Sequence, residues 1–286
     1  MKRKQSTRRV GLASVLQLCM VGVLATAGCG DSSKSTQTKV AQKTEEVKAS
    51  AVEPEGHEAL AFEIAKEGGK VRFEMEAPME RQDGVVPESA VRGEVFFDLK
   101  DLSKSTGLIN VDIAELEIFQ QKAKEAGAYG EREKSELQNE HMRGWLEIGP
   151  DAPEEERTKN SLVQFEMKSI SSSSVQDVSA MQGAARVVRF EALGEFRLHQ
   201  RSSTKTVELE AEFHYEEDAP VSVHVKSVKP FVVDLDEHGV RPRTAFGMLA
   251  KKGLAAMSPK VGKDVQVSVD FLATIKEKPS ARKKAH

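Results

Sequence analysis

Residues 207–215 read VELEAEFHY, and this stretch decides the fold. Its apolar residues, Val207, Leu209, Ala211, Phe213 and Tyr215, alternate with three glutamates and one histidine. Successive side chains of a β-strand point to opposite faces, whereas a helix would mix both kinds of side chain on each face. The stretch therefore predicts a strand with one buried face and one face in water.

The same alternation recurs along the rest of the chain. Together with residues 207–215 it gives about eight strands, each with one apolar face. Such strands are typical of antiparallel sheets that are closed into a barrel or folded as a sandwich, so we expect a mainly all-β protein. The other segments are Val71–Met75, Val91–Leu99, Gly107–Ile113, Val163–Met167, Phe190–Leu198, Val221–Val225 and Val265–Phe271.

Two regions break the alternation. Residues 114–145 are rich in Glu, Lys, Ala, Gln and Leu, which favour helix. We expect them to form one or two helices inserted between strands, covering one end of the barrel. Residues 244–257 predict a second short helix or an irregular lid.

The first residues resemble an export signal. Lys2, Arg3, Lys4, Arg8 and Arg9 precede an uncharged, largely apolar run over 10–27. A positive start, an apolar core and small residues at the exit are the parts of a secretory signal, which we place at residues 1–28.

The signal ends Ala27-Gly28-Cys29, which resembles the lipobox of bacterial lipoproteins. In that class the cysteine receives a diacylglycerol, so the resemblance implies lipid attachment at Cys29. Thr26 stands where leucine is usual, which leaves an uncleaved anchor helix or an ordinary secretory signal as alternatives. All three readings place the body outside the cytoplasm. We expect a cell-envelope protein that is lipid-anchored to a membrane and faces the periplasm or the exterior.

The rest of the chain divides by composition. Residues 29–56 are rich in Ser, Thr, Lys, Gln and Glu, so they bury too little apolar surface to order themselves and predict a flexible tether. Residues 57–277 carry the alternating segments and form the predicted barrel domain. Residues 278–286 are basic and predict a solvated tail.

Composition argues against several functions. The net charge of −3 gives no case for nucleic-acid binding. Cys19 and Cys29 are the two cysteines, so the body has no thiol for a disulfide, a zinc site or a nucleophile. Hydrolase, phosphate-binding and dinucleotide motifs are absent from the sequence, and the histidines are scattered. We expect a protein that is not an enzyme and has no metal.

Several segments together resemble the YceI-like family of polyisoprenoid-binding, lipocalin-like proteins. They cover about residues 70–276, and their order and spacing carry the resemblance. Gln200 stands where that family usually has glycine after the central histidine, and residues 114–140 are longer and more charged than usual. The segments are 93–103 (GEVFFDLKDLS), 111–113 (VDI), 140–146 (EHMRGWL), 162–170, 194–199 (GEFRLH) with 204–209 (TKTVEL), 246–247, and 261–273.

The resemblance implies a lipocalin-like barrel that binds an apolar lipid, such as a polyisoprenoid or an isoprenoid quinone, for transport, storage or sensing. Each CH₂ taken out of water contributes about 0.8 kcal/mol, so an apolar tail needs no specific polar contact. The candidate residues lining the barrel are Phe73, Val95, Phe97, Phe165, Phe196, Leu209, Phe213, Val223, Val267 and Phe271.

The same side chains could instead fill the core, because an eight-stranded barrel can be packed solid. The alternative function is then a filled barrel that acts as a protein–protein interaction module of the cell envelope, presenting residues 114–145 or its charged wall. The sequence does not identify a protein partner.

Overall fold

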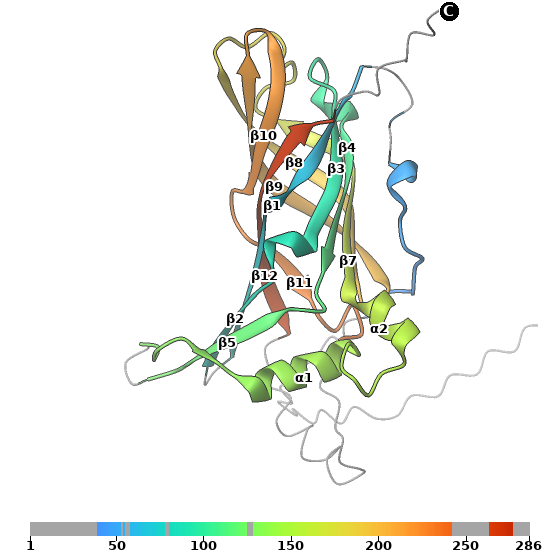
Figure 1. Cartoon of the computed structure of the whole chain (residues 1–286), viewed down its shortest axis with the longest axis vertical. Helices are drawn as coiled ribbons and strands as arrows, with labels where there is room; N and C mark the ends of the chain where they lie inside the picture. Colours follow the sequence, from blue (N-terminus) through green and yellow to red (C-terminus); the bar gives the residue numbers. More distant parts are fainter. Residues whose placement is uncertain are drawn as a thin grey trace, which may run out of the picture. The chain divides into compact units, whose positions relative to one another are not determined.

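The computed structural model describes residues 39–52, 54, 58–77, 80–124, 128–241 and 263–276. Within them, twelve strands form one antiparallel sheet in the order β11-β12-β10-β9-β8-β7-β4-β3-β1-β2-β5-β6. Figure 1 labels strands by their order along the chain and colours them from blue to red in that order. Their bounds are β1 Leu60–Ala77, β2 Glu80–Val85, β3 Val91–Phe97, β4 Thr106–Asp112, β5 Glu117–Lys122, β6 Glu133–Lys134, β7 Leu162–Ser173, β8 Ala185–Leu198, β9 Arg201–Glu216, β10 Ala219–Ser227, β11 Phe231–Asp234 and β12 Asp264–Ile275.

The sheet closes on itself because β12 also pairs with β1. This pairing runs from Phe62 opposite Ile275 to Glu74 opposite Gln266. Eight strands, β1, β3, β4, β7, β8, β9, β10 and β12, thereby form a closed ring. These are the eight strands that the alternation predicted, and the expectation of an antiparallel lipocalin-like barrel is confirmed in preference to a sandwich.

Strand β9 shows why the alternation predicts the barrel. From Val207 to Tyr215, its apolar residues are buried and the residues between them are partly exposed. Strand β8 pairs with it over its whole length, from Ala185 opposite His214 to Leu198 opposite Arg201. The two apolar faces therefore line the same interior.

One end of the barrel is wider because two strands change neighbours along their length. Residues 60–63 of β1 pair with β3, whereas residues 72–77 pair with β2. A register shift between Ile64 and Gly69 separates the two parts. In the same way β12 pairs with β10 near its end and with β11 over Asp264–Val267. The ring strands part here, and β2, β5 and β11 extend the wall.

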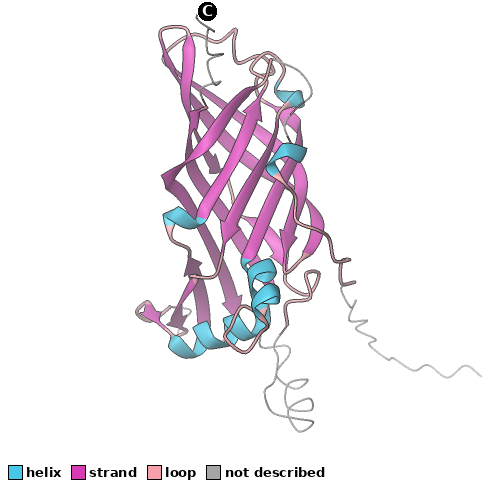
Figure 2. Cartoon of the chain, turned by 45° about the vertical axis from the view of Figure 1, so that its right-hand side comes forward, coloured by secondary structure: helices cyan, strands magenta, loops and turns pink. Residues whose placement is uncertain are grey.

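The helices lie at this wider end, as Figure 2 shows. They are α1 (Glu136–Leu146) and α2 (Glu154–Ser161). The expected helical insert in residues 114–145 is confirmed by α1, but the helical reading of its first part is wrong, because Glu117–Lys122 forms β5 and pairs with β2. An available sheet edge overrides a modest helix propensity. Three short 3₁₀ helices, at Ala49–Ala51, Glu88–Ala90 and Leu102–Lys104, complete the described helices.

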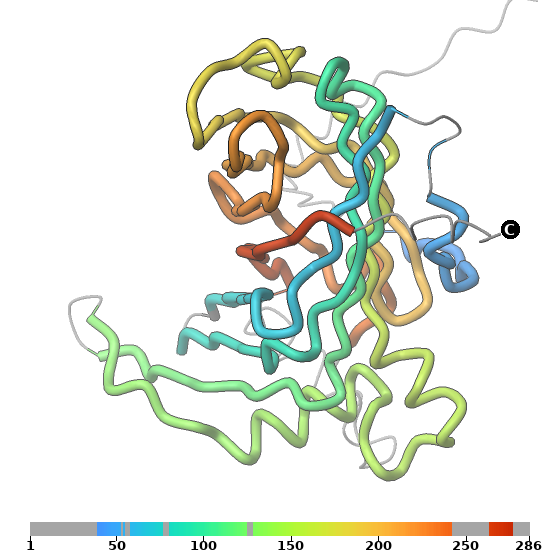
Figure 3. The backbone as a smooth tube through the Cα atoms, turned by 45° about the horizontal axis from the view of Figure 1, so that its top comes forward, coloured from blue at the N-terminus to red at the C-terminus, as the bar shows by residue number. Residues whose placement is uncertain are grey.

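Residues 39–52 form a strap that runs along the outside of the barrel, drawn in blue in Figures 1 and 3. The backbone N–H of Ala41 donates to the carbonyl of Glu237 (2.8 Å), and that of Thr44 donates to the carbonyl of Gln200 (2.7 Å). At its far end Val52 is 5% exposed. Composition predicts a flexible tether over 29–56, but the structure places 39–52 against the wall, because barrel groups provide the partners that the segment lacks by itself.

Several predicted features lie outside the described residues. These are the signal at 1–28, Cys29, the helix or lid at 244–257, and the basic tail at 278–286.

Candidate functional site

The wider end of the barrel contains a partly open cavity of about 180 Å³. Its walls come from β1, β2, β4, β5, β7, β8, β9, β11 and β12, and from the segment between β4 and β5. Apolar side chains dominate its lining. Those facing it from the walls include Val71, Phe73, Ile109, Val111, Ile113, Leu116, Ile118, Val163, Phe165, Phe196, Leu198, Val207, Leu209, Phe231, Val233, Val265, Val267 and Val269.

Helix α1 closes one side of the cavity through Met142, Trp145 and Leu146. Their three- and four-residue spacing places them on one face of the helix. Ser135 caps the start of the helix, since its side chain accepts a hydrogen bond from the N–H of Gln138.

Asn139 fixes α1 to the sheet. It is fully buried. Its Oδ1 accepts from the N–H of Ile118 (2.8 Å), and its Nδ2 donates to the carbonyls of Ile118 (3.0 Å) and Ser135 (2.8 Å). This side chain therefore bonds like a backbone peptide, and it holds the apolar face of α1 over the cavity.

Three glutamines are the polar residues among those lining the cavity, and their amides have partners. Gln164 bonds to both backbone groups of Val47 in the strap, each at 2.9 Å. Gln82 and Gln138 both donate to Glu80 Oε1. The lining contains no charged side chain. Since transferring an unpaired charge into an apolar site is strongly unfavourable, the cavity favours an uncharged, apolar occupant.

The predicted lining residues divide between this cavity and its surroundings. Five of them, Phe73, Phe165, Phe196, Leu209 and Val267, line it. Val95, Phe97 and Phe271 line a separate, smaller cavity of about 20 Å³. Phe213 and Val223 are fully buried among core side chains and line neither cavity. Part of the barrel interior is therefore filled, as the alternative reading expected.

Sequence reasoning missed the contribution of α1 and β11. Met142, Trp145 and Leu146 carried a detectable signal, because their helical spacing marks an apolar face. Phe231 and Val233 of β11 carried none, since a strand of four residues is too short for alternation to be recognised.

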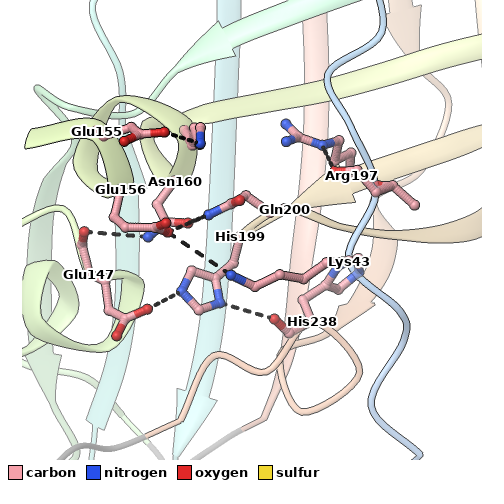
Figure 4. A network of polar contacts seen from close by, with 11 residues as sticks. Lys43, Glu147, Glu155, Glu156, Asn160, Arg197, His199, Gln200 and His238 are labelled. Atoms are coloured by element: carbon pink, nitrogen blue, oxygen red, sulfur yellow. Dashed lines mark hydrogen bonds and ion pairs between the residues drawn. The ribbon is translucent and has the colours of Figure 1, made fainter. Parts of the chain in front are cut away.

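A polar network ties α1 to the barrel next to the cavity (Figure 4). Glu147 follows the last residue of α1, and its Oε2 lies 2.9 Å from Nε2 of His199. The other ring nitrogen of His199 lies 3.2 Å from the carbonyl of His238. His199 therefore links the end of α1 to the backbone of His238.

The turn between β8 and β9 carries this network. His199 and Gln200 both have positive φ (49° and 60°), as a two-residue hairpin turn requires. Neither is the glycine or asparagine that favours this conformation. Gln200 Nε2 donates to Glu156 Oε2 (2.8 Å) and Asn160 Oδ1 (2.7 Å) in α2. The side-chain bonds to both helices offset the backbone strain and explain why glutamine can stand here.

His238 is the fully buried titratable group of this network. Its Nδ1 donates to the carbonyl of Arg201 (2.9 Å), and its Nε2 lies 3.1 Å from Ser203 Oγ. These bonds satisfy the neutral ring, with Nε2 as acceptor. Burial lowers the pKa of His238 below its ordinary value of 6.5, since desolvation penalises the charged form.

In the part of the chain that the structure describes, no cluster of three or more His, Cys, Asp or Glu side chains is placed to hold a metal ion.

Among the same residues, no helix is long and apolar enough to span a bilayer.

Comparison with known proteins gives similarity in structure. No protein-family model matches the chain. No curated protein matches it either. One similar solved structure is a polyisoprenoid binding domain from Saccharophagus degradans, described as implicated in plant cell wall breakdown. The two structures superpose with a TM-score of 0.46 at 10% sequence identity, and the match covers 76% of this chain and 99% of that one.

A second similar structure is BcnA of Burkholderia cenocepacia, with a TM-score of 0.45 and 12% identity, covering 74% of this chain and 99% of that one. At such identities and TM-scores, neither likeness says what this chain binds. The chain itself has the closed antiparallel eight-stranded barrel that its resemblance to the YceI-like family implied.

Proposed function

We propose that this protein is a non-enzymatic envelope lipoprotein that binds the apolar part of a lipid, of the polyisoprenoid or isoprenoid-quinone class, in the cavity beneath α1. One observation carries the proposal: a cavity of about 180 Å³ is lined by apolar side chains and by three glutamines whose amides have partners. An engineered apolar cavity of about 150 Å³ stays dry and binds benzene. The site is thus suited to a hydrocarbon.

The volume limits how much of the lipid is enclosed. By comparison with the benzene-binding cavity, the space corresponds to roughly one to two isoprene units. Each buried methylene contributes about 0.8 kcal/mol, so even this short segment gives useful affinity. A long prenyl lipid would therefore insert one end of its tail, and its remaining units and headgroup would lie outside the cavity.

The strap supports a role at a membrane surface. It begins at the cavity end of the barrel, where Lys43 lies 4.0 Å from Glu156 of α2 and Ala41 bonds to Glu237. Lys39 follows Cys29 by ten positions, and an extended chain of that length spans at most about 35 Å. An acylated Cys29 would thus keep the cavity end of the barrel within reach of the bilayer from which a ligand would come.

Lipid extraction tests the ligand. Protein purified from membranes is extracted with organic solvent and the extract is analysed by mass spectrometry, with Val207→Phe, whose ring occupies part of the cavity, as the matched control. We expect a prenyl lipid or quinone in the wild-type extract and its depletion in the variant. Equal amounts of lipid in both extracts, or none in either, would contradict binding in this cavity and favour the interaction module.

A second experiment tests the anchor. Cells given radiolabelled palmitate should label the wild-type protein and leave Cys29→Ser unlabelled. Membrane fractionation should then move the variant to the soluble fraction. Label on the Cys29→Ser protein would refute acylation at this residue.

A further inference from the structure

The two cavities lie on either side of a narrow neck in the barrel interior. The smaller cavity, of about 20 Å³, is lined by Val95, Phe97, Phe190 and Phe271 among others. Ile109, Phe165 and Leu209 line both cavities, so these three side chains separate them. Ile109 and Phe165 are register partners on the neighbouring strands β4 and β7, and Leu209 lies on β9.

A group of four phenylalanines fills the interior next to the smaller cavity. The ring centroid of Phe97 lies 5.0 Å from that of Phe213, 5.9 Å from that of Phe62 and 6.2 Å from that of Phe190. All of these pairs meet edge to face, the arrangement that aromatic quadrupoles favour. Each ring is at most 3% exposed. This aromatic group closes the lumen beyond the neck.

The neck is held in place by the wall around it. A Cβ added at Gly194 would lie 2.9 Å from Cζ of Phe165 and 2.3 Å from the carbonyl oxygen of Glu166. The glycine thus lets the Phe165 ring lie close against β8. Leu209 is 5% exposed and pairs with Phe190 of β8 on one side and Ser227 of β10 on the other. Closely packed side chains do not yield to a ligand without strain.

We propose that the neck of Ile109, Phe165 and Leu209, backed by the aromatic group, sets the length of apolar chain that the protein accepts. This inference rests on the proposed function and deepens it, because it makes the site selective for the end of a chain. A chain entering the main cavity gains affinity with each methylene until its end reaches the neck. Further methylenes stay outside the cavity and add nothing.

Straight-chain primary alcohols of increasing length provide the probe. Trp145 is the single tryptophan of the chain, and it lines the main cavity, so its fluorescence reports occupancy. In the delipidated wild-type protein we expect the dissociation constant to fall about four-fold per added methylene and then to level off. The length at which it levels off is the quantity to be measured.

Leu209→Ala opens the neck and joins the two cavities. We call the alcohol length at which the dissociation constant levels off the break. Leu209→Ala should move this break to alcohols longer by roughly three methylene groups, the size of the side-chain segment removed. Val233→Ala is the matched control, because Val233 is 1% exposed and lines the main cavity only. It should change affinity by a similar factor at every length and leave the break where it is.

The outcomes separate the inference from the proposed function. If the wild-type protein binds no alcohol, the proposed function fails. If it binds alcohols with a break that Leu209→Ala does not move, the length limit at the neck is refuted although apolar binding stands. Far-UV circular dichroism checks folding, and Ile109→Ala and Phe165→Leu repeat the test with other neck residues should Leu209→Ala fail to fold.

Discussion

Replacing Val207 with phenylalanine should stabilise the barrel and weaken ligand binding, because the new ring enters the main cavity. Val207 lies on β9, is 3% exposed and lines that cavity. At about 24 cal/mol per Å³, filling the whole cavity of about 180 Å³ would stabilise the folded protein by at most about 4 kcal/mol. The phenyl group fills part of this space, so we expect the free energy of unfolding to rise by about 1–2 kcal/mol.

Val188→Phe is the matched control for this prediction. Val188 is fully buried on β8 and lines neither cavity. The same substitution there overpacks a filled region, which typically costs about 1–3 kcal/mol. The two variants add the same atoms to equally buried valines and should shift stability in opposite directions.

Urea denaturation of delipidated protein, followed through Trp145 fluorescence and far-UV circular dichroism, gives both free energies. Coincidence of the two signals checks that unfolding is two-state. Titration with an apolar probe should show at least a ten-fold loss of affinity in Val207→Phe. Destabilisation by Val207→Phe as large as that by Val188→Phe would show that the cavity has no room for a ring, and the proposed binding site would fail with it.

Three further predictions follow from single contacts. Burial lowers the pKa of His238 below 6.5, so below that pH the unfolded chain binds more protons than the folded one and the free energy of unfolding should fall. His238→Gln should flatten this part of a plot of unfolding free energy against pH. An unchanged slope would contradict a role of His238 in this pH dependence. Glu147→Ala removes the bond to His199 and should cost about 0.5–1.5 kcal/mol, with faster amide hydrogen exchange in α1; equal exchange rates would show that the bond does not hold the helix. A Cβ on Gly84 would lie 1.7 Å from Cζ of Phe73, so Gly84→Ala should displace that ring from its place in the cavity wall. The affinity for an apolar ligand, measured by calorimetry, should then fall. An unchanged affinity would show that the position of this ring does not matter for binding.

The eight ring strands could be predicted from the sequence because each has one face in water, whereas their closure into a ring rests on the pairing of β12 with β1. The alternation in β9 leaves a single arrangement in which its apolar side chains avoid solvent. Strand β5 could not be predicted in this way. Its residues favour helix in isolation, and they form a strand because β2 presents an unpaired edge to them.

The candidate site was predicted in part. The strand positions of Phe165 and Leu209 determine that both face the interior, but not whether space remains beside them. Phe213 alternates as regularly as Leu209 and is packed solid against Phe62 and Phe97. Periodicity reports which face is dry, whereas the volume enclosed depends on side chains from opposite walls.

The sequence by itself determined the alternating faces, an antiparallel sheet with one dry face and the absence of a reactive thiol from its body, because these depend on residue order and composition. The tertiary structure alone decided that the sheet closes, that part of the lumen is filled, that α1 covers the main cavity, and that residues 39–52 lie along the wall. These features depend on contacts between segments far apart in the sequence, such as those made where β1 and β12 change partners.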